Sequence, residues 1–194
     1  MLLYRAFPYL ESAQPGQSGH PMFLYRPQGQ GRLDNPTLYD TWYFGLTPEV
    51  AVGETFADVT TFADGMFQFP ALPGSRRALG TYEIPDNSPI LDLDDANHLQ
   101  ERALRPTQVI ARNRPATQAW ARRIFDERAD SGDRRWRGVR WWSYHRPHWV
   151  VIALFTPRDS APIHTLVEVE TLSLGHASVV SAANTLGKTT NPGG

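Results

Sequence analysis

The chain has 194 residues, 41% of them hydrophobic, and a formal net charge of −1, which suits one domain that buries roughly 70% of its unfolded surface. It contains no cysteine, which excludes disulfides, thiolate catalysis and cysteine-ligated zinc. Because it has neither an apolar run of about eighteen residues nor a signal-like apolar segment at its start, we expect a cytoplasmic protein without membrane contact.

The first half of the chain predicts two strands and a helix. Residues 2–7 are apolar enough for an opening strand, and the glycines and prolines of 11–31 indicate a long irregular loop. Residues 39–45 alternate as a strand does. Thr47 and Pro48 then supply a capping hydroxyl and a first-turn proline, so we expect a helix over 48–57.

The second half of the chain alternates strands with helices, and its last twenty residues are small and polar. We expect strands at 77–85, 89–93, 138–145, 149–155 and 164–174, a short helix that ends near residue 103, and a longer amphipathic helix at 115–129. The chain end is predicted to fray. With no repeat and no linker, this pattern predicts a single α+β domain.

Charge is distributed unevenly along the chain. Residues 1–100 carry five basic and twelve acidic side chains, whereas residues 101–150 carry twelve arginines and five acids. The basic block is interpreted either as a solvated helix face or as a patch for phosphates or an acidic partner. No nucleic-acid-binding module is visible, so direct nucleic-acid binding is not expected.

Common metal and nucleotide motifs are missing or incomplete. His145, His148 and His164 have no carboxylate at metal-ligand spacing, and Asp92 begins an acidic run that lacks the rest of a calcium loop. No Walker or dinucleotide glycine motif is present. We therefore expect no metal and no bound cofactor.

Four polar residues instead suggest chemistry on a dinucleotide. Arg32, Tyr43 and Glu54 are equally spaced, and Ser143 follows much later. Glu54 could stabilise an oxocarbenium-like transition state, Arg32 or Arg5 could bind a diphosphate, and the Tyr43 ring could stack on nicotinamide. Ser143 could bond the amide or a phosphate oxygen. From chemistry alone, a core tyrosine, a surface glutamate and a solvated or ion-paired arginine are the more usual interpretations of such residues.

At these residues the sequence resembles the RES domain family. The resemblance runs through LYRAF at 3–7, GRLDNPTLYDTWYFGLTPEVAVGETF at 31–56 and GVRWWS at 138–143, and then the apolar strand that ends at Phe155. The Arg–Tyr–Glu spacing within 31–56 is its most specific part.

The resemblance implies an ADP-ribosyltransferase-like mixed or split sheet with flanking helices, forming an NAD-binding catalytic domain over 1–175. Residues 176–194 match no pattern of the family, and their composition predicts a flexible tail. It implies an NAD-degrading toxin of a bacterial toxin–antitoxin pair, acting by phosphorolysis or hydrolysis. Arg32, Tyr43, Glu54 and Ser143 become the catalytic set, and Tyr4 and Arg5 become substrate-binding residues. NAD would be the substrate, with inorganic phosphate open as a co-substrate.

The resemblance also implies a helix-turn-helix antitoxin as partner, and it leaves a homodimer open. Two other functions stay open beside NAD degradation. One is transfer of ADP-ribose to a protein or small acceptor, because the same oxocarbenium chemistry serves a different nucleophile. The other is a non-catalytic module that binds NAD or ADP-ribose.

Overall fold

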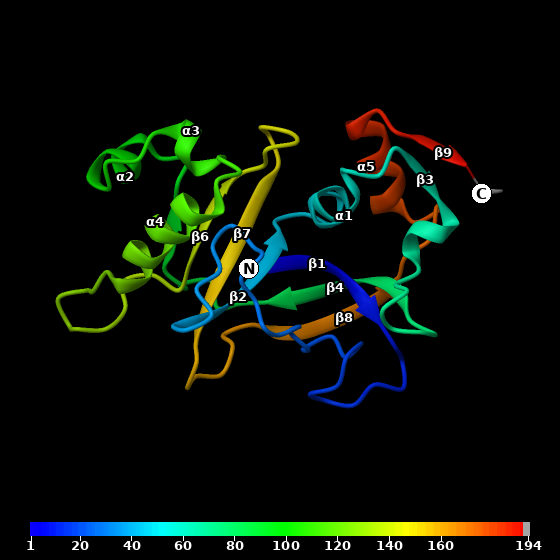
Figure 1. The fold of residues 1–194 in the computed structure, drawn as a ribbon, viewed down its shortest axis with the longest axis horizontal. Helices are drawn as coiled ribbons and strands as arrows, with labels where there is room; N and C mark the ends of the chain where they lie inside the picture. Colours follow the sequence, from blue (N-terminus) through cyan, green and yellow to red (C-terminus); the bar gives the residue numbers. More distant parts are fainter. Residues whose placement is uncertain (192–194) are drawn as a thin grey trace. The chain divides into compact units, whose positions relative to one another are not determined.

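The computed structural model describes residues 1–191, and its chain contacts divide it into two compact units. Unit 1 combines residues 1–25, 44–84 and the part of the chain from 164 onward, and unit 2 combines 26–43 with 85–163. Figure 1 labels the helices α1–α5 and most of the strands of the two units. None of the helices in residues 1–191 is long and apolar enough to cross a membrane.

Unit 1 contains an antiparallel run of strands in the order β1–β4–β8, formed by Leu2–Tyr9, Arg76–Glu83 and Thr165–Thr171. In its register Arg5 lies opposite Gly80. Short strands β3 (Thr61–Ala63) and β9 (Thr189–Asn191) pair in parallel, and η1 (Asp64–Phe67) follows β3.

Helices α1 (Pro48–Phe56) and α5 (Ala177–Leu186) pack against each other in unit 1. Both helices contribute apolar side chains to one hydrophobic cluster. Its buried members from the two helices are Ala51, Val52, Phe56, Val179, Ala182 and Ala183. The Thr47 hydroxyl accepts from the backbone N–H of Val50, so the predicted cap of α1 is confirmed.

Unit 2 contains strands in the order β5–β6–β7–β2, and the chain passes from unit 2 to unit 1 within β2. Their bounds are Ile90–Asp92, Gly138–Trp142, Val150–Pro157 and Tyr39–Gly45. β5 and β6 are parallel, and β6 and β7 are antiparallel. The sheet strands are thus mostly antiparallel, and the predicted α+β fold class is confirmed.

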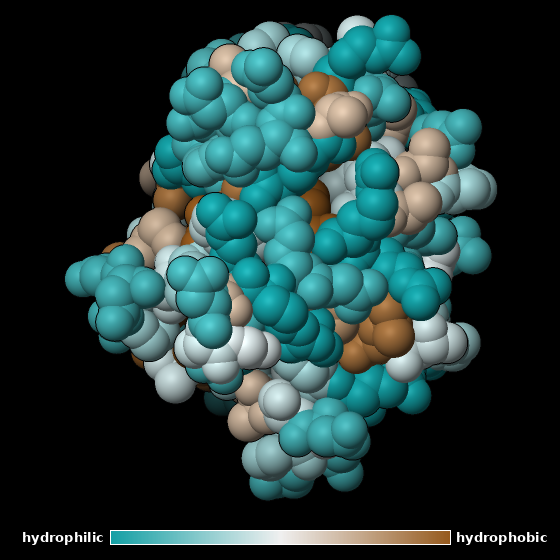
Figure 2. All heavy atoms as spheres, turned by 90° about the vertical axis from the view of Figure 1, so that its left-hand side faces the viewer, coloured by the Kyte–Doolittle hydropathy of each residue, from teal (hydrophilic) through white to brown (hydrophobic). Residues whose placement is uncertain are grey.

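Three helices complete unit 2, namely α2 (Ala96–Glu101), α3 (Pro106–Val109) and α4 (Arg114–Asp126). α4 begins at an Asn113 cap and buries one face through Trp120, Ile124 and their neighbours. Figure 2 looks onto the side of Figure 1 where these helices lie, and this face is mainly hydrophilic.

The C-terminal region differs from the prediction. The sequence was expected to end in a flexible tail at 176–194, but Ala177–Leu186 form α5 and Thr189–Asn191 form β9. α5 is ordered because Val179, Ala182 and Ala183 are buried at helical spacing, and Gly187 ends it in the left-handed conformation at φ 68°. Residues 192–194 lie outside the described part of the chain.

Candidate functional site

The six predicted site residues fall into two sets, one in each unit. Unit 1 holds Tyr4, Arg5 and Glu54, and unit 2 holds Arg32, Tyr43 and Ser143. The surroundings of each residue within its own unit show which of them are fixed by the fold and which are exposed to a ligand.

Arg32 lies in the loop before β2 and is held at both its side chain and its backbone. Its guanidinium donates to the carbonyl of Val109 and lies 5.8 Å from the centre of the Trp141 ring. Its carbonyl accepts from the Thr117 hydroxyl of α4 at 2.6 Å. A cation over an indole face gains electrostatic stabilisation. Arg32 is therefore oriented in advance, as an arginine that binds an anion needs to be.

Tyr43 lies on β2, and its hydroxyl forms hydrogen bonds to the loop that carries Arg32. It accepts from the N–H of Leu33 and donates to the Asp34 carboxylate, both at 2.9 Å. Burial, and then the charge of Asp34, raise the pKa of Tyr43 well above its usual value, so the hydroxyl remains protonated. Tyr43 thus fixes the loop that carries Arg32, in addition to any stacking that its ring could provide.

Asp34 is the residue around which this loop closes. It is buried, and its other carboxylate oxygen accepts from the N–H groups of Gly29 and Gly31 at 2.9 and 2.7 Å. A Cβ on Gly31 would lie 2.4 Å from Asp34 and 2.5 Å from the Tyr43 hydroxyl, so only glycine fits there. We refer to Gly29, Gly31, Asp34 and Tyr43 as the Asp34 network.

Ser143 follows β6 directly and is buried. Its hydroxyl oxygen accepts from the N–H of His145 at 2.9 Å and of Arg146 at 3.4 Å, and its own N–H donates to the carbonyl of Trp149. These bonds shape the turn from β6 to β7. Ser143 is two residues from Trp141, the residue whose ring lies under Arg32.

Glu54 differs from the other members of the predicted set because it is exposed. It lies on α1, whose Val50, Val52 and Phe56 face the core. The rigid inner face of the helix therefore positions a carboxylate that a ligand can reach. α1 packs on β1, the strand that carries Tyr4 and Arg5.

Arg5 is surrounded by aromatic side chains and backbone carbonyls. It donates to the carbonyl of Phe23 at 3.5 Å, and it lies 5.9 Å from the centre of the Phe7 ring. Burial lowers the pKa of Arg5, which the neighbouring Tyr82 hydroxyl partly offsets. Tyr4, by contrast, packs against the core cluster of α1 and α5. Its ring is therefore used for packing within unit 1.

His164 is only 2% exposed. Its ring contacts those of Phe44 and Tyr82, at centroid distances of 5.2 and 5.6 Å. Burial, with a further effect from the positive charge of Arg5, lowers the pKa of His164 to about 4. His164 is therefore neutral near pH 7.

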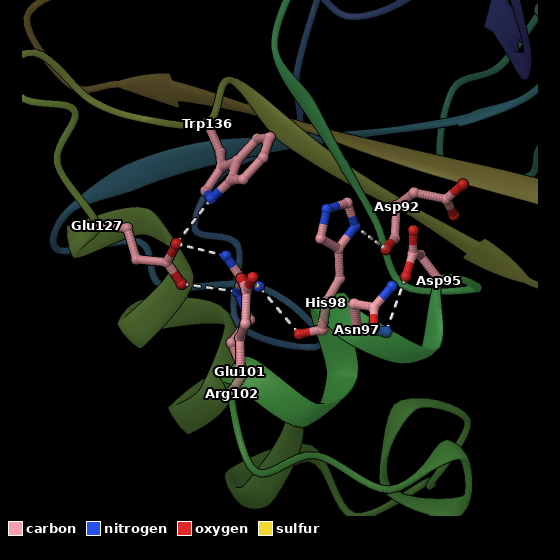
Figure 3. Close-up of polar contacts among 8 residues, drawn as sticks. All are labelled: Asp92, Asp95, Asn97, His98, Glu101, Arg102, Glu127 and Trp136. Atoms are coloured by element: carbon pink, nitrogen blue, oxygen red, sulfur yellow. Dashed lines mark hydrogen bonds and ion pairs between the residues drawn. The ribbon is translucent and has the colours of Figure 1, made fainter.

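Some arginines of the basic block at 101–150 form ion pairs with carboxylates of unit 2. Arg102 makes two hydrogen bonds to Glu127, at 2.8 and 2.7 Å, and Trp136 donates to the same carboxylate (Figure 3). Glu101 contacts Arg102 from the other side. Arg140 pairs with Asp92. Arg102 and Arg140 therefore stabilise unit 2 through ion pairs, and only the other arginines of 101–150 could form a patch that binds anions.

The sequence analysis did not predict the roles of two residues, Asp34 and His164. Asp34 stands two positions after Arg32 within GRLDNP, so its proximity to Arg32 was a usable signal. His164 was considered only as a metal ligand. Among residues 1–191 no group of three or more histidines and carboxylates is arranged to hold a metal ion.

Comparison with known proteins identifies the family. The RES domain matches residues 2–175, and the chain belongs to this family. No curated protein matches. Among solved structures, the chain is similar in fold to the MbcT toxin in the crystal structure of the M. tuberculosis MbcT–MbcA toxin–antitoxin complex. The TM-score is 0.60 and the identity is 13%, over 96% of this chain and 89% of the other. All six predicted site residues lie within the matched range.

Proposed function

We propose that the protein is the toxin of a bacterial toxin–antitoxin pair and that it degrades NAD by cleaving the nicotinamide–ribose bond. Membership of the RES family supports this proposal, and so does the likeness in fold to a toxin. The structural observation that carries it is Glu54, an exposed carboxylate on a helix whose opposite face is buried.

In the proposed reaction the bond between ribose C1′ and the nicotinamide nitrogen breaks, and its electron pair leaves with neutral nicotinamide. Positive charge develops on the ribose, and the Glu54 carboxylate stabilises it electrostatically. A water or phosphate oxygen then forms the new bond to C1′, and a water nucleophile releases its proton to solvent. Arg32 or Arg5 binds the substrate diphosphate through the planar fork of its guanidinium.

The test is nicotinamide release from NAD by the purified protein, with and without phosphate. We expect Glu54→Gln to reduce kcat by about a hundredfold or more while the melting temperature stays unchanged, because the residue is exposed. Glu83→Gln, an exposed glutamate on β4, is the matched control and should retain activity. Release that rises with phosphate indicates phosphorolysis, and activity of Glu54→Gln equal to that of the wild type would refute the mechanism.

The proposed partner is an antitoxin of the helix-turn-helix type. MbcT is described as part of a toxin–antitoxin complex, and the shared fold makes an analogous partner the first one to test. Co-expression with the product of the neighbouring gene should yield a complex in which NAD cleavage is suppressed. Full activity in a stable complex would argue against inhibition by masking of the site.

A further inference from the structure

Within the described residues, Arg77 on β4 has no carboxylate counterion. Its Nε is buried without a hydrogen-bond partner, and no carboxylate within residues 1–191 lies at ion-pair distance from it. Its guanidinium carbon lies 4.8 Å from the centre of the Phe69 ring. Arg77 is half-buried, and this partial burial lowers its pKa because it removes part of the guanidinium from water.

Two other half-buried arginines of the described chain, by contrast, are paired with carboxylates. The adjacent Arg76 forms two bonds to Asp64, at 3.2 and 2.6 Å. Arg102 lies between Glu127 and Glu101 (Figure 3). A desolvated charge with no opposite charge destabilises the fold, so an unpaired guanidinium is typical of a residue kept for an external anion.

A row of aromatic rings connects the surroundings of Arg77 with those of Arg5. The Phe69 ring contacts Tyr25 at a centroid distance of 6.0 Å, and Tyr25 contacts Phe23 at 4.9 Å. The carbonyl of Phe23 accepts from Arg5. The charge of Arg5 further lowers the pKa of Arg77, so the two cations are close enough to repel each other. An oxyanion between them would relieve this repulsion.

A pocket of about 310 Å³ lies against the same ring. It is formed by the loop from η1 to β4, and its lining includes Phe69, Pro70, Leu72 and Pro73. A pocket of mixed polar and apolar lining, which shares the Phe69 ring with Arg77, suits a ligand that combines a charged group with an organic ring. Tyr25 is 41% exposed, so the aromatic row is open to such a ligand.

We propose that Arg77 and Arg5, together with the Tyr25 and Phe69 rings, form a binding site for the diphosphate of a nucleotide ligand. The identity of the ligand as a dinucleotide or its ADP-ribose product rests on the proposed function. The site itself rests on the unpaired guanidinium, the aromatic row and the adjoining pocket. Arg77 is thereby assigned as a substrate-positioning residue.

The experiment is isothermal titration of the full chain with pyrophosphate and with ADP-ribose at near-physiological salt. Arg77→Ala should raise the Kd of both ligands by about tenfold or more, because it removes charge-assisted hydrogen bonds. Arg77→Lys keeps the positive charge and the aliphatic part of the side chain but not the planar guanidinium, so it should raise the Kd of both ligands by a smaller factor. Arg158→Ala removes the same charge at an exposed position and should leave both Kd values unchanged.

Three outcomes would overturn the proposal. The first is that both Arg77 variants bind the two ligands with wild-type affinity and show only a lower melting temperature. Arg77 would then act only through its structural cation–π contact with Phe69. The second is an equal loss in Arg158→Ala, which would indicate unspecific attraction. The third is a wild-type chain that binds neither ligand. Nicotinamide release is measured separately, so an inactive protein that still needs Arg77 for pyrophosphate would refute the proposed function alone.

Discussion

At the scale of residues, the Asp34 network places Arg32. The buried Asp34 carboxylate accepts from two backbone N–H groups and from the Tyr43 hydroxyl. When one partner of a buried hydrogen bond is removed, the other is left without a partner, and each such group lowers the free energy of unfolding by about 1–3 kcal/mol. Tyr43 is consequently assigned two separable contributions, one from its hydroxyl and one from its ring.

Tyr43→Phe separates these contributions. The variant loses the bonds to Leu33 and Asp34 but keeps the ring, so we expect the free energy of unfolding to fall by about 1–2 kcal/mol. If the hydroxyl acts by holding the Arg32 loop, the KM for NAD should rise with little change in kcat. Denaturant unfolding and steady-state kinetics measure both, and an unchanged stability would contradict the role of the network. Tyr144→Phe, at an exposed tyrosine, is the control.

His164 predicts a dependence of stability on pH. Its pKa is about 4 in the folded chain, below its ordinary value of 6.5, so the unfolded chain binds more protons between these pH values. Stability is therefore fully present above pH 6.5 and falls as the pH decreases toward 4. The contribution of this one group is about 3 kcal/mol at most.

The measurement is the free energy of unfolding of the wild type, His164→Gln and His148→Gln across this range. His164→Gln should show a weaker decline on acidification, whereas His148→Gln, at an exposed position, should decline like the wild type. Parallel curves for the wild type and His164→Gln would mean that His164 is not held neutral by the fold.

At the scale of elements, α5 is an integral part of unit 1. Its side chains bury against α1, and its Ser181 and Thr185 hydroxyls donate to the two carboxylate oxygens of Glu49 at 2.7 and 2.5 Å. The parallel pairing of β9 with β3 secures the chain beyond the helix. The helix that carries Glu54 is thus supported by the last described elements of the chain.

Two adjacent valines of α5 test this support. Val179 is fully buried, so Val179→Ala should lower the free energy of unfolding by about 2 kcal/mol through lost burial and a cavity. Val180 is 42% exposed, and Val180→Ala should change it by less than about 0.5 kcal/mol. Thermal or denaturant unfolding measures both. Equal effects would show that α5 does not pack as described.

At the scale of the whole molecule, the predicted site residues are shared between the two compact units, and each unit fixes its own set by different means. In unit 2, Arg32 and Ser143 lie in loops and Tyr43 lies on β2, and hydrogen bonds hold all three in place. Unit 1 holds Arg5 and Glu54 on a strand and a helix packed over an apolar core. The cations of unit 1 also include Arg77, which increases the positive charge available to a diphosphate.

Local patterns of the sequence determined most of the elements. The alternation of 39–45 and the Thr47–Pro48 cap predicted β2 and α1, whose bounds the structure confirms to within a residue. The amphipathic period of 115–129 likewise predicted α4. These predictions succeed because hydrophobic period and capping depend on residues close together in the chain. The family resemblance, which rests on the motifs within 3–155, was also readable from sequence.

Tertiary structure alone decided the features that depend on distant residues. α5 is ordered because it shares a core with α1, and β9 is ordered because it pairs with β3, which lies much earlier in the chain. Because these partners are distant in sequence, the small and polar residues of 176–191 resembled a flexible tail. The importance of Asp34 appears only once Gly29, Gly31 and Tyr43 converge on it. The unpaired state of Arg77 is likewise visible only when every neighbouring carboxylate is placed. Whether a side chain is buried and whether its polar atoms are hydrogen-bonded depends on residues that only folding brings together, so neither can be predicted from a single sequence.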